Sequence, residues 1–146
     1  MLQRVQTIFL LCCLVICLLL HYTPVYELVP VVNNADPAAV NPTFTIFKSA
    51  ILVMLNAGVG VLTLVSIFLY KRRNLQIRLV NLNLLLTLIL LGLMFFAADT
   101  MSQTNEMKVQ YKYGIYLPIV QVVFFFLAAR FIKRDEDLVR SADRLR

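Results

Sequence analysis

The residues of this chain that could carry out chemistry are few, and their spacing does not fit catalysis or metal binding. The single histidine, His21, has no carboxylate near it in the sequence. A catalytic zinc ion usually has three side-chain ligands and one open position. A single histidine cannot supply these three ligands. The three cysteines, at positions 12, 13 and 17, form no Cys-x-x-Cys pair and are expected to pack as small apolar side chains. We therefore expect no enzymatic activity, no metal and no cofactor.

Neutral polar side chains inside apolar stretches are the second group that could act on a molecule. Five of them are expected to make interhelical polar contacts: Asn56, Ser66, Asn83, Thr87 and Gln121. Counting inward from the ends of the stretches places Asn56 level with Gln121, and Ser66 level with Asn83. Interhelical hydrogen bonds between side chains at matched depth contribute about 0.6 kcal/mol each. We favour this structural role over the alternative, a path for a neutral solute lined by Asn56, Thr87 and Gln121.

Four apolar stretches must position these side chains. They cover about residues 5–22, 47–70, 79–98 and 113–132, and each approaches the length of about 20 residues that a helix needs to cross the hydrocarbon of a bilayer. The chain is 60% hydrophobic and only 15% charged, whereas soluble domains average about 25% charged residues. The sequence predicts a single all-α membrane domain over residues 1–146, a four-helix up-down transmembrane bundle. Because no small-x-small pattern follows the first stretch, we expect it to be an uncleaved span.

The basic residues gather at one set of span ends. Eleven of the fourteen Lys and Arg lie near the N-terminus, in the loop 71–78, or from Arg130 to the C-terminus. Because basic residues favour the cytoplasmic ends of spans, both termini and this loop are expected in the cytoplasm. The basic excess on this side, which accounts for the net charge of +6, then faces an anionic leaflet, and this explains the charge without nucleic acid. The basic loop residues are Lys71, Arg72, Arg73 and Arg78.

The two outer loops, 23–46 and 99–112, contain short segments with the alternation of β-strands. Residues 25–32 and 43–47 mix β-branched and aromatic residues, and the segment Met-Lys-Val-Gln-Tyr-Lys-Tyr alternates polar with apolar side chains. We expect these segments to pair as a small β-like extracytoplasmic cap.

The chain ends in a highly charged segment, residues 133–146, in which nine of fourteen residues carry a charge. No Gly or Pro interrupts it, and its apolar residues recur at spacings of three and four, so it is predicted to extend the fourth span as a cytoplasmic amphipathic helix. Its acidic triplet, 135–137, could pair with Lys71, Arg72 and Arg73, or the helix could lie on lipid. We favour a surface for protein contact, with these interaction residues: Arg134, Asp135, Glu136, Leu138, Arg140, Asp143 and Arg144.

The two ends, MLQRVQT and RFIKRDEDLVRSADRLR, resemble a family of small bacterial inner-membrane proteins with four spans, known as a domain of unknown function. The resemblance covers the whole length and implies a topology and a cytoplasmic motif, without an activity, substrate or cofactor. The matching positions are Gln3, Arg4, Arg134, Asp135, Glu136, Leu138, Val139, Arg140, Ser141, Ala142, Asp143 and Arg144.

Together these features indicate a non-enzymatic accessory or scaffold subunit of a larger membrane assembly, which docks through its charged tail. Its expected partners are the lipid bilayer and either a membrane protein or a second copy of the chain. The alternative is a small oligomeric transporter or channel for a neutral solute.

Overall fold

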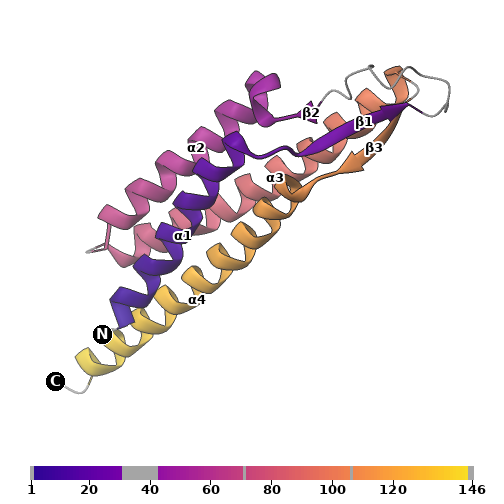
Figure 1. The fold of residues 1–146 in the computed structure, drawn as a ribbon. Helices are drawn as coiled ribbons and strands as arrows, with labels where there is room; N and C mark the ends of the chain where they lie inside the picture. Colours follow the sequence, from indigo (N-terminus) through magenta and orange to yellow (C-terminus); the bar gives the residue numbers. More distant parts are fainter. Residues whose placement is uncertain (1, 31–42, 71, 106, 145–146) are drawn as a thin grey trace.

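Four long helices and a small sheet make up the part of the chain that the computed structural model describes, residues 2–30, 43–70, 72–105 and 107–144. The elements, in chain order, are α1 (Leu2–Tyr22), β1 (Tyr26–Pro30), β2 (Thr43–Phe44), a 3₁₀ turn (Ile46–Lys48), α2 (Ala50–Phe68), α3 (Arg73–Asn105), β3 (Met107–Tyr111), a second 3₁₀ turn (Tyr113–Ile115) and α4 (Tyr116–Arg144). Successive helices run in opposite directions, so the start of α1 and the end of α4 lie together, far from the sheet (Figure 1). The predicted four-helix up-down bundle is confirmed.

The helix ends differ from the expected span ends. Helix α3 is 33 residues long and begins at Arg73, so most of the expected loop 71–78 is helical. The segment Arg-Asn-Leu-Gln-Ile-Arg contains no Gly or Pro, and Leu, Gln and Arg favour helix even where the chain is polar. At the other end of the bundle, 3₁₀ turns precede α2 and α4, which delays the start of both helices. Pro118 stands in the first turn of α4, where its missing N–H breaks no helical hydrogen bond.

The strands form one antiparallel sheet in the order β2-β1-β3, which confirms the predicted β cap. Residues Tyr26–Pro30 pair with Met107–Tyr111, and Tyr26 also pairs with Phe44 of β2. The sheet ties the connection between α1 and α2 to the connection between α3 and α4. An ion pair between Lys112 Nζ and Glu27 Oε2, at 2.9 Å, lies at the same place.

Two apolar clusters form the core of the described residues. One lies at the sheet end, where Leu20, Tyr26 and Ile46 pack with Leu90 and Met94. The other lies between the helices farther from the sheet; it contains Leu10, Cys13, Cys17, Val59, Val80, Phe125, Ala128 and Ile132.

The outer surface of the bundle is apolar as well. Large side chains such as Ile51, Met54 and Phe96 are about 70% exposed, far beyond the scattered apolar residues of a soluble surface. Among the described residues, four helices are long and apolar enough to cross a bilayer: Val5–Tyr22, Ala50–Phe68, Arg73–Gln103 and Tyr113–Val139. A lipid environment accounts for the exposed apolar belt, as expected for a multi-pass membrane protein with four spans.

Candidate functional site

The five polar residues predicted inside the spans all face the interior of the bundle. Asn56, Ser66, Asn83, Thr87 and Gln121 are each 0% exposed. Three further buried polar side chains accompany them: Gln6, Thr63 and Gln76. Together these eight side chains, here called the polar column, come from all four helices. None of them is ionisable, so the column offers hydrogen bonds without a permanent charge.

Cys17 of α1 joins the upper part of the polar column, nearest the sheet. Asn56 Nδ2 donates to the Cys17 carbonyl oxygen at 2.9 Å, and Gln121 Nε2 lies 2.9 Å from the Cys17 sulfur. Asn56 of α2 and Gln121 of α4 therefore both contact Cys17 of α1, and they do not bond to each other. Apart from the place of Cys17 in the first span, no pattern in the sequence indicates this role.

Asn83 does not pair with Ser66 as expected. Asn83 Nδ2 donates to Thr63 Oγ1 at 3.3 Å, and Gln76 Nε2 donates to the Ser66 carbonyl oxygen at 3.0 Å. The reason is the early start of α3, which places Gln76 opposite Ser66 and moves Asn83 toward the middle of α2. Thr87 bonds within its own helix, since its hydroxyl donates to the Asn83 carbonyl oxygen at 2.8 Å.

Three amide oxygens of the polar column have no hydrogen-bond partner among the described residues. They are Asn56 Oδ1, Asn83 Oδ1 and Gln121 Oε1, and all three are buried. Buried polar atoms are paired in the great majority of cases, so three unpaired acceptors in one bundle require an explanation.

The tail helix is attached to the start of α3. Arg73 forms an ion pair with Asp135, with Nη2 and Oδ2 at 3.3 Å, and its Nη1 donates to the Asp135 carbonyl oxygen at 3.4 Å. The amide of Asn74 faces the Glu136 carboxylate and donates to Oε1 at 2.5 Å in the orientation that satisfies both groups. Asp135 and Glu136, two of the three acidic residues at 135–137, therefore face the start of α3. Lys71 lies outside the described residues, and Arg72 and Arg78 are exposed.

A second set of contacts holds the tail-proximal part of α4 against α1. Gln6 Nε2 donates to the Phe131 carbonyl oxygen at 3.1 Å, and the Phe9 and Phe131 rings stack with centroids 5.6 Å apart. Beyond this level the helix exposes Arg134, and Leu138 and Val139 are 50% and 44% exposed. Arg140, Asp143 and Arg144 belong to α4, but their side chains lie outside the described part.

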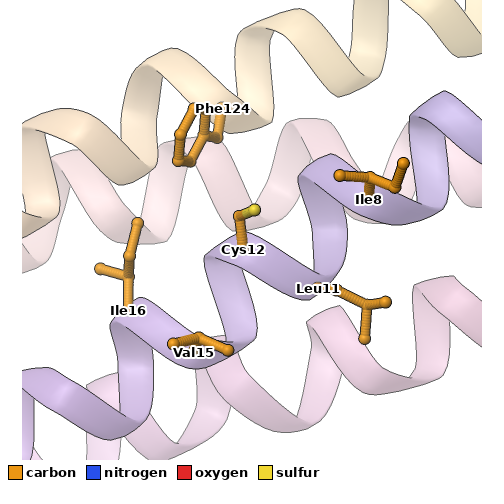
Figure 2. A pocket seen from close by; sticks show the side chains of 6 residues that line it. All are labelled: Ile8, Leu11, Cys12, Val15, Ile16 and Phe124. Carbon is orange, nitrogen blue, oxygen red and sulfur yellow. The ribbon is translucent and has the colours of Figure 1, made fainter.

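Two hollows open on the lipid-facing sides of α1. One, of about 390 Å³, lies between α1 and α4; Figure 2 shows five α1 side chains and, from α4, Phe124. Its lining is apolar apart from the Cys12 thiol. The other, of about 360 Å³, lies between α1 and α2 and includes His21 and Asn56 in its lining. Within the described ranges, no three His, Cys, Asp or Glu residues come together in a group that could hold a metal ion.

The comparisons with known proteins agree with the resemblance carried by the two ends. The chain matches no curated protein and no solved structure. A family described as "Domain of unknown function (DUF4293)" matches residues 2–145, nearly the whole chain. This protein, a four-helix bundle with a small antiparallel sheet at one end, therefore belongs to the DUF4293 family of domains of unknown function.

Proposed function

We propose that this chain is a non-enzymatic accessory or scaffold subunit of a larger assembly in the bacterial inner membrane, and that it docks through the end of α4. The observation that carries the proposal is the exposure of apolar side chains on the charged end of α4, past the span of residues 113–132 that the sequence predicts. Leu138 and Val139 are about half exposed at a level where Lys133, Arg134 and Asp137 are exposed too.

The attachment of the tail helix supports this role. Because Asp135 and Glu136 are engaged by Arg73 and Asn74, the opposite side of the helix is held outward in one orientation. That side carries Arg134 and Leu138, which lie four residues apart and share a helix face. A rigidly held face loses less conformational entropy on binding than a mobile tail would.

The charge distribution supports a cytoplasmic location for this surface. Arg72, Arg78, Lys133 and Arg134 are exposed at the end of the bundle away from the sheet, and basic residues favour the cytoplasmic side. With the sheet on the opposite side, both termini face the cytoplasm.

Affinity purification of the full-length chain from membranes tests the proposal. The unaltered chain should recover a membrane protein in fixed stoichiometry, and the double variant Arg134→Glu, Leu138→Glu should lose that protein while still inserting. Arg72→Glu is the matched control, because it removes an exposed charge at the same end without touching the tail face. A chain that purifies alone in every mild detergent contradicts the proposal, and so does a partner retained by the double variant.

The unpaired amide oxygens favour a second candidate, a small oligomeric transporter or channel for a neutral solute. Asn56 Oδ1 and Gln121 Oε1 could bind the hydroxyl or amide hydrogens of such a solute as it passes. In vesicles containing the protein, swelling in an uncharged solute such as glycerol should exceed that of empty vesicles. The double variant Asn56→Leu, Gln121→Leu should remove the excess, and Ser66→Ala, which removes a buried hydroxyl bonded within its own helix and outside the proposed path, serves as the comparison. If the double variant swells like the unaltered protein, this candidate is lost.

A further inference from the structure

Two polar side chains lie on the outward side of α3, close to its basic end. Arg78 and Asn81 stand three residues apart, so they share one side of the helix, and both are exposed. Leu82 and Leu85 continue this side of the helix and are 41% and 53% exposed. The side of α3 formed by these four residues, here called the Arg78 face, therefore presents a guanidinium, then an amide, then an apolar surface.

The ion pair between α3 and α4 shows where the Arg78 face meets the membrane boundary. Arg73 pairs with Asp135, and the two helices are antiparallel. Arg78 comes five residues after the first member of this pair, and Arg130 comes five residues before the second, so these two exposed arginines lie at about the same depth. The next charged residue of α3 follows 21 residues later, about 32 Å along the helix, close to the hydrocarbon thickness of about 30 Å. Arg78 therefore marks the boundary, and Asn81 lies about 4.5 Å deeper.

The neighbouring helix α2 is apolar at the same depths. Asn83 of α3 bonds to Thr63 of α2, which sets these two residues at one level. Counting two and five residues back along α3, and as many forward along the antiparallel α2, gives Val65 and Phe68 at the levels of the amide and the guanidinium. They are 38% and 71% exposed. The pair of polar side chains is thus a property of the Arg78 face and not of its depth in the membrane.

The order of groups on the Arg78 face matches the order of groups in a phospholipid. A guanidinium binds a phosphate with two parallel hydrogen bonds, and a side-chain amide N–H donates to a carbonyl oxygen such as that of an acyl ester. The headgroup region of a bilayer is about 5–8 Å thick on each side, so a step of about 4.5 Å from Arg78 to Asn81 fits within it. The acid nearest to this side of α3, Glu136, faces Asn74, one helical turn farther from the membrane interior. Arg78 forms no ion pair with another described residue.

We propose that the Arg78 face binds an anionic diacyl phospholipid. The phosphate accepts hydrogen bonds from the Arg78 guanidinium, an ester carbonyl accepts one from Asn81 Nδ2, and an acyl chain lies along Leu82 and Leu85. The site belongs to α3 alone and does not rest on docking through the end of α4, so either proposal can fail without the other.

The absence of tryptophan from the sequence allows a fluorescence test at a chosen place. Leu85→Trp puts the fluorophore at the apolar end of the proposed site. Val61→Trp is the matched comparison on α2: it is 61% exposed and lies two residues from Thr63, as Leu85 lies two residues from Asn83, so the depth is the same.

The full-length protein in phosphatidylcholine vesicles is titrated with three lipids that carry bromine on their chains as quencher. The first is ester-linked phosphatidylglycerol. The second is the ether-linked form, which keeps the phosphate and lacks the carbonyl acceptors. The third is ester-linked phosphatidylcholine, which has no net charge. Quenching gives the binding constant of each lipid relative to the lipid of the vesicle.

The Leu85→Trp protein should prefer ester-linked to ether-linked phosphatidylglycerol by about two- to tenfold, the range expected for one hydrogen bond. It should also prefer ester-linked phosphatidylglycerol to phosphatidylcholine, because of the charge of Arg78. The Val61→Trp protein should bind the ester and ether forms equally. Equal binding of the ester and ether forms at Leu85→Trp, an equal ester preference at both positions, or no preference for the anionic lipid overturns the proposal.

Substitutions within the Leu85→Trp protein assign the two preferences to their side chains. Asn81→Leu should remove the ester preference and keep the preference for the anionic lipid, whereas Arg78→Gln should remove the latter. Arg72→Gln is the matched control, because it removes an exposed charge that lies just before α3 and outside the Arg78 face, and it should keep both preferences. An ester preference that survives Asn81→Leu, or a charge preference that Arg72→Gln lowers as much as Arg78→Gln, also overturns the proposal.

Discussion

Tyr26 is buried where the sheet meets the bundle, and its ring stacks on Phe44 with centroids 4.5 Å apart. Its hydroxyl has no hydrogen-bond partner among the described residues, and burial raises the pKa of Tyr26 to about 12. The neutral phenol is therefore favoured in the folded state. Its contribution to stability is complete below pH 10, the ordinary pKa, and is lost as the pH rises toward 12.

We predict that Tyr26→Phe makes the free energy of unfolding less sensitive to pH between 10 and 12. Because the hydroxyl is unpaired, its removal should cost little stability at pH 7. Denaturant titrations in detergent at several pH values measure both effects. Tyr113→Phe, which changes a tyrosine that is 63% exposed, should leave the pH dependence as it is. An unchanged slope in Tyr26→Phe would contradict this assignment.

Gly114 stands at the closest approach between the second 3₁₀ turn and the segment before β1. A Cβ atom built there would lie 2.4 Å from the Pro24 carbonyl oxygen, which also accepts the Gly114 N–H at 3.0 Å. We predict that Gly114→Ala lowers the free energy of unfolding by about 1–3 kcal/mol, the usual cost of overpacking. Gly58→Ala is the matched control, because nothing lies within 4 Å of the added atom, and it should not destabilise the protein. A tolerated Gly114→Ala would show that the turn can move away from Pro24.

At the scale of the elements, the attachment of the tail to α3 sets how firmly the end of α4 is held. Arg73 and Asp135 have side chains that are 26% and 14% exposed, so their ion pair is only partly screened by water. We predict a coupling free energy of about 1 kcal/mol between Arg73→Ala and Asp135→Ala, near the upper end for exposed pairs. Hydrogen exchange of the amides in residues 133–141 measures it.

The control is a second double-mutant cycle with Arg72→Ala and Asp137→Ala, which removes one exposed positive and one exposed negative charge nearby. Their coupling should fall within error of zero. A coupling for Arg73 and Asp135 no larger than that of the control would mean that the tail is not held by this pair.

The elements differ in how well the sequence predicts them. Hydrocarbon thickness fixes the length of an apolar stretch, so the spans were identifiable, and alternation identified the strands. Hydropathy locates the part of a helix that lies in the hydrocarbon, and it does not show where the helix begins or ends. For this reason residues 73–78, which are helical, were expected in a loop. Partner choice among buried amides depends on helix rotation and depth, so the bonds from Asn83 to Thr63 and from Gln121 to Cys17 could not be derived from spacing alone.

At the scale of the whole molecule, the two ends of the bundle should lie on opposite sides of the membrane. We predict that Lys108→Cys, in β3, reacts with a membrane-impermeant thiol reagent in intact cells from which the outer membrane has been removed. Lys133→Cys, in α4, should react only after the inner membrane is opened. The native cysteines give a low background, because Cys13 and Cys17 are buried and Cys12 is half-buried within α1. Labelling in the reverse order would invert the topology inferred from the basic residues.

The sheet closes the bundle at one end with backbone hydrogen bonds between β1 and both of its neighbours. The far end is held by side chains, chiefly the contacts of Gln6 and Arg73 with α4. Helix α4, with 29 residues or about 43 Å, runs unbroken from one end to the other. Backbone hydrogen bonds therefore hold one end of the bundle and side-chain contacts the other, and a force applied to residues 133–141 would be carried toward the sheet end along one continuous helix.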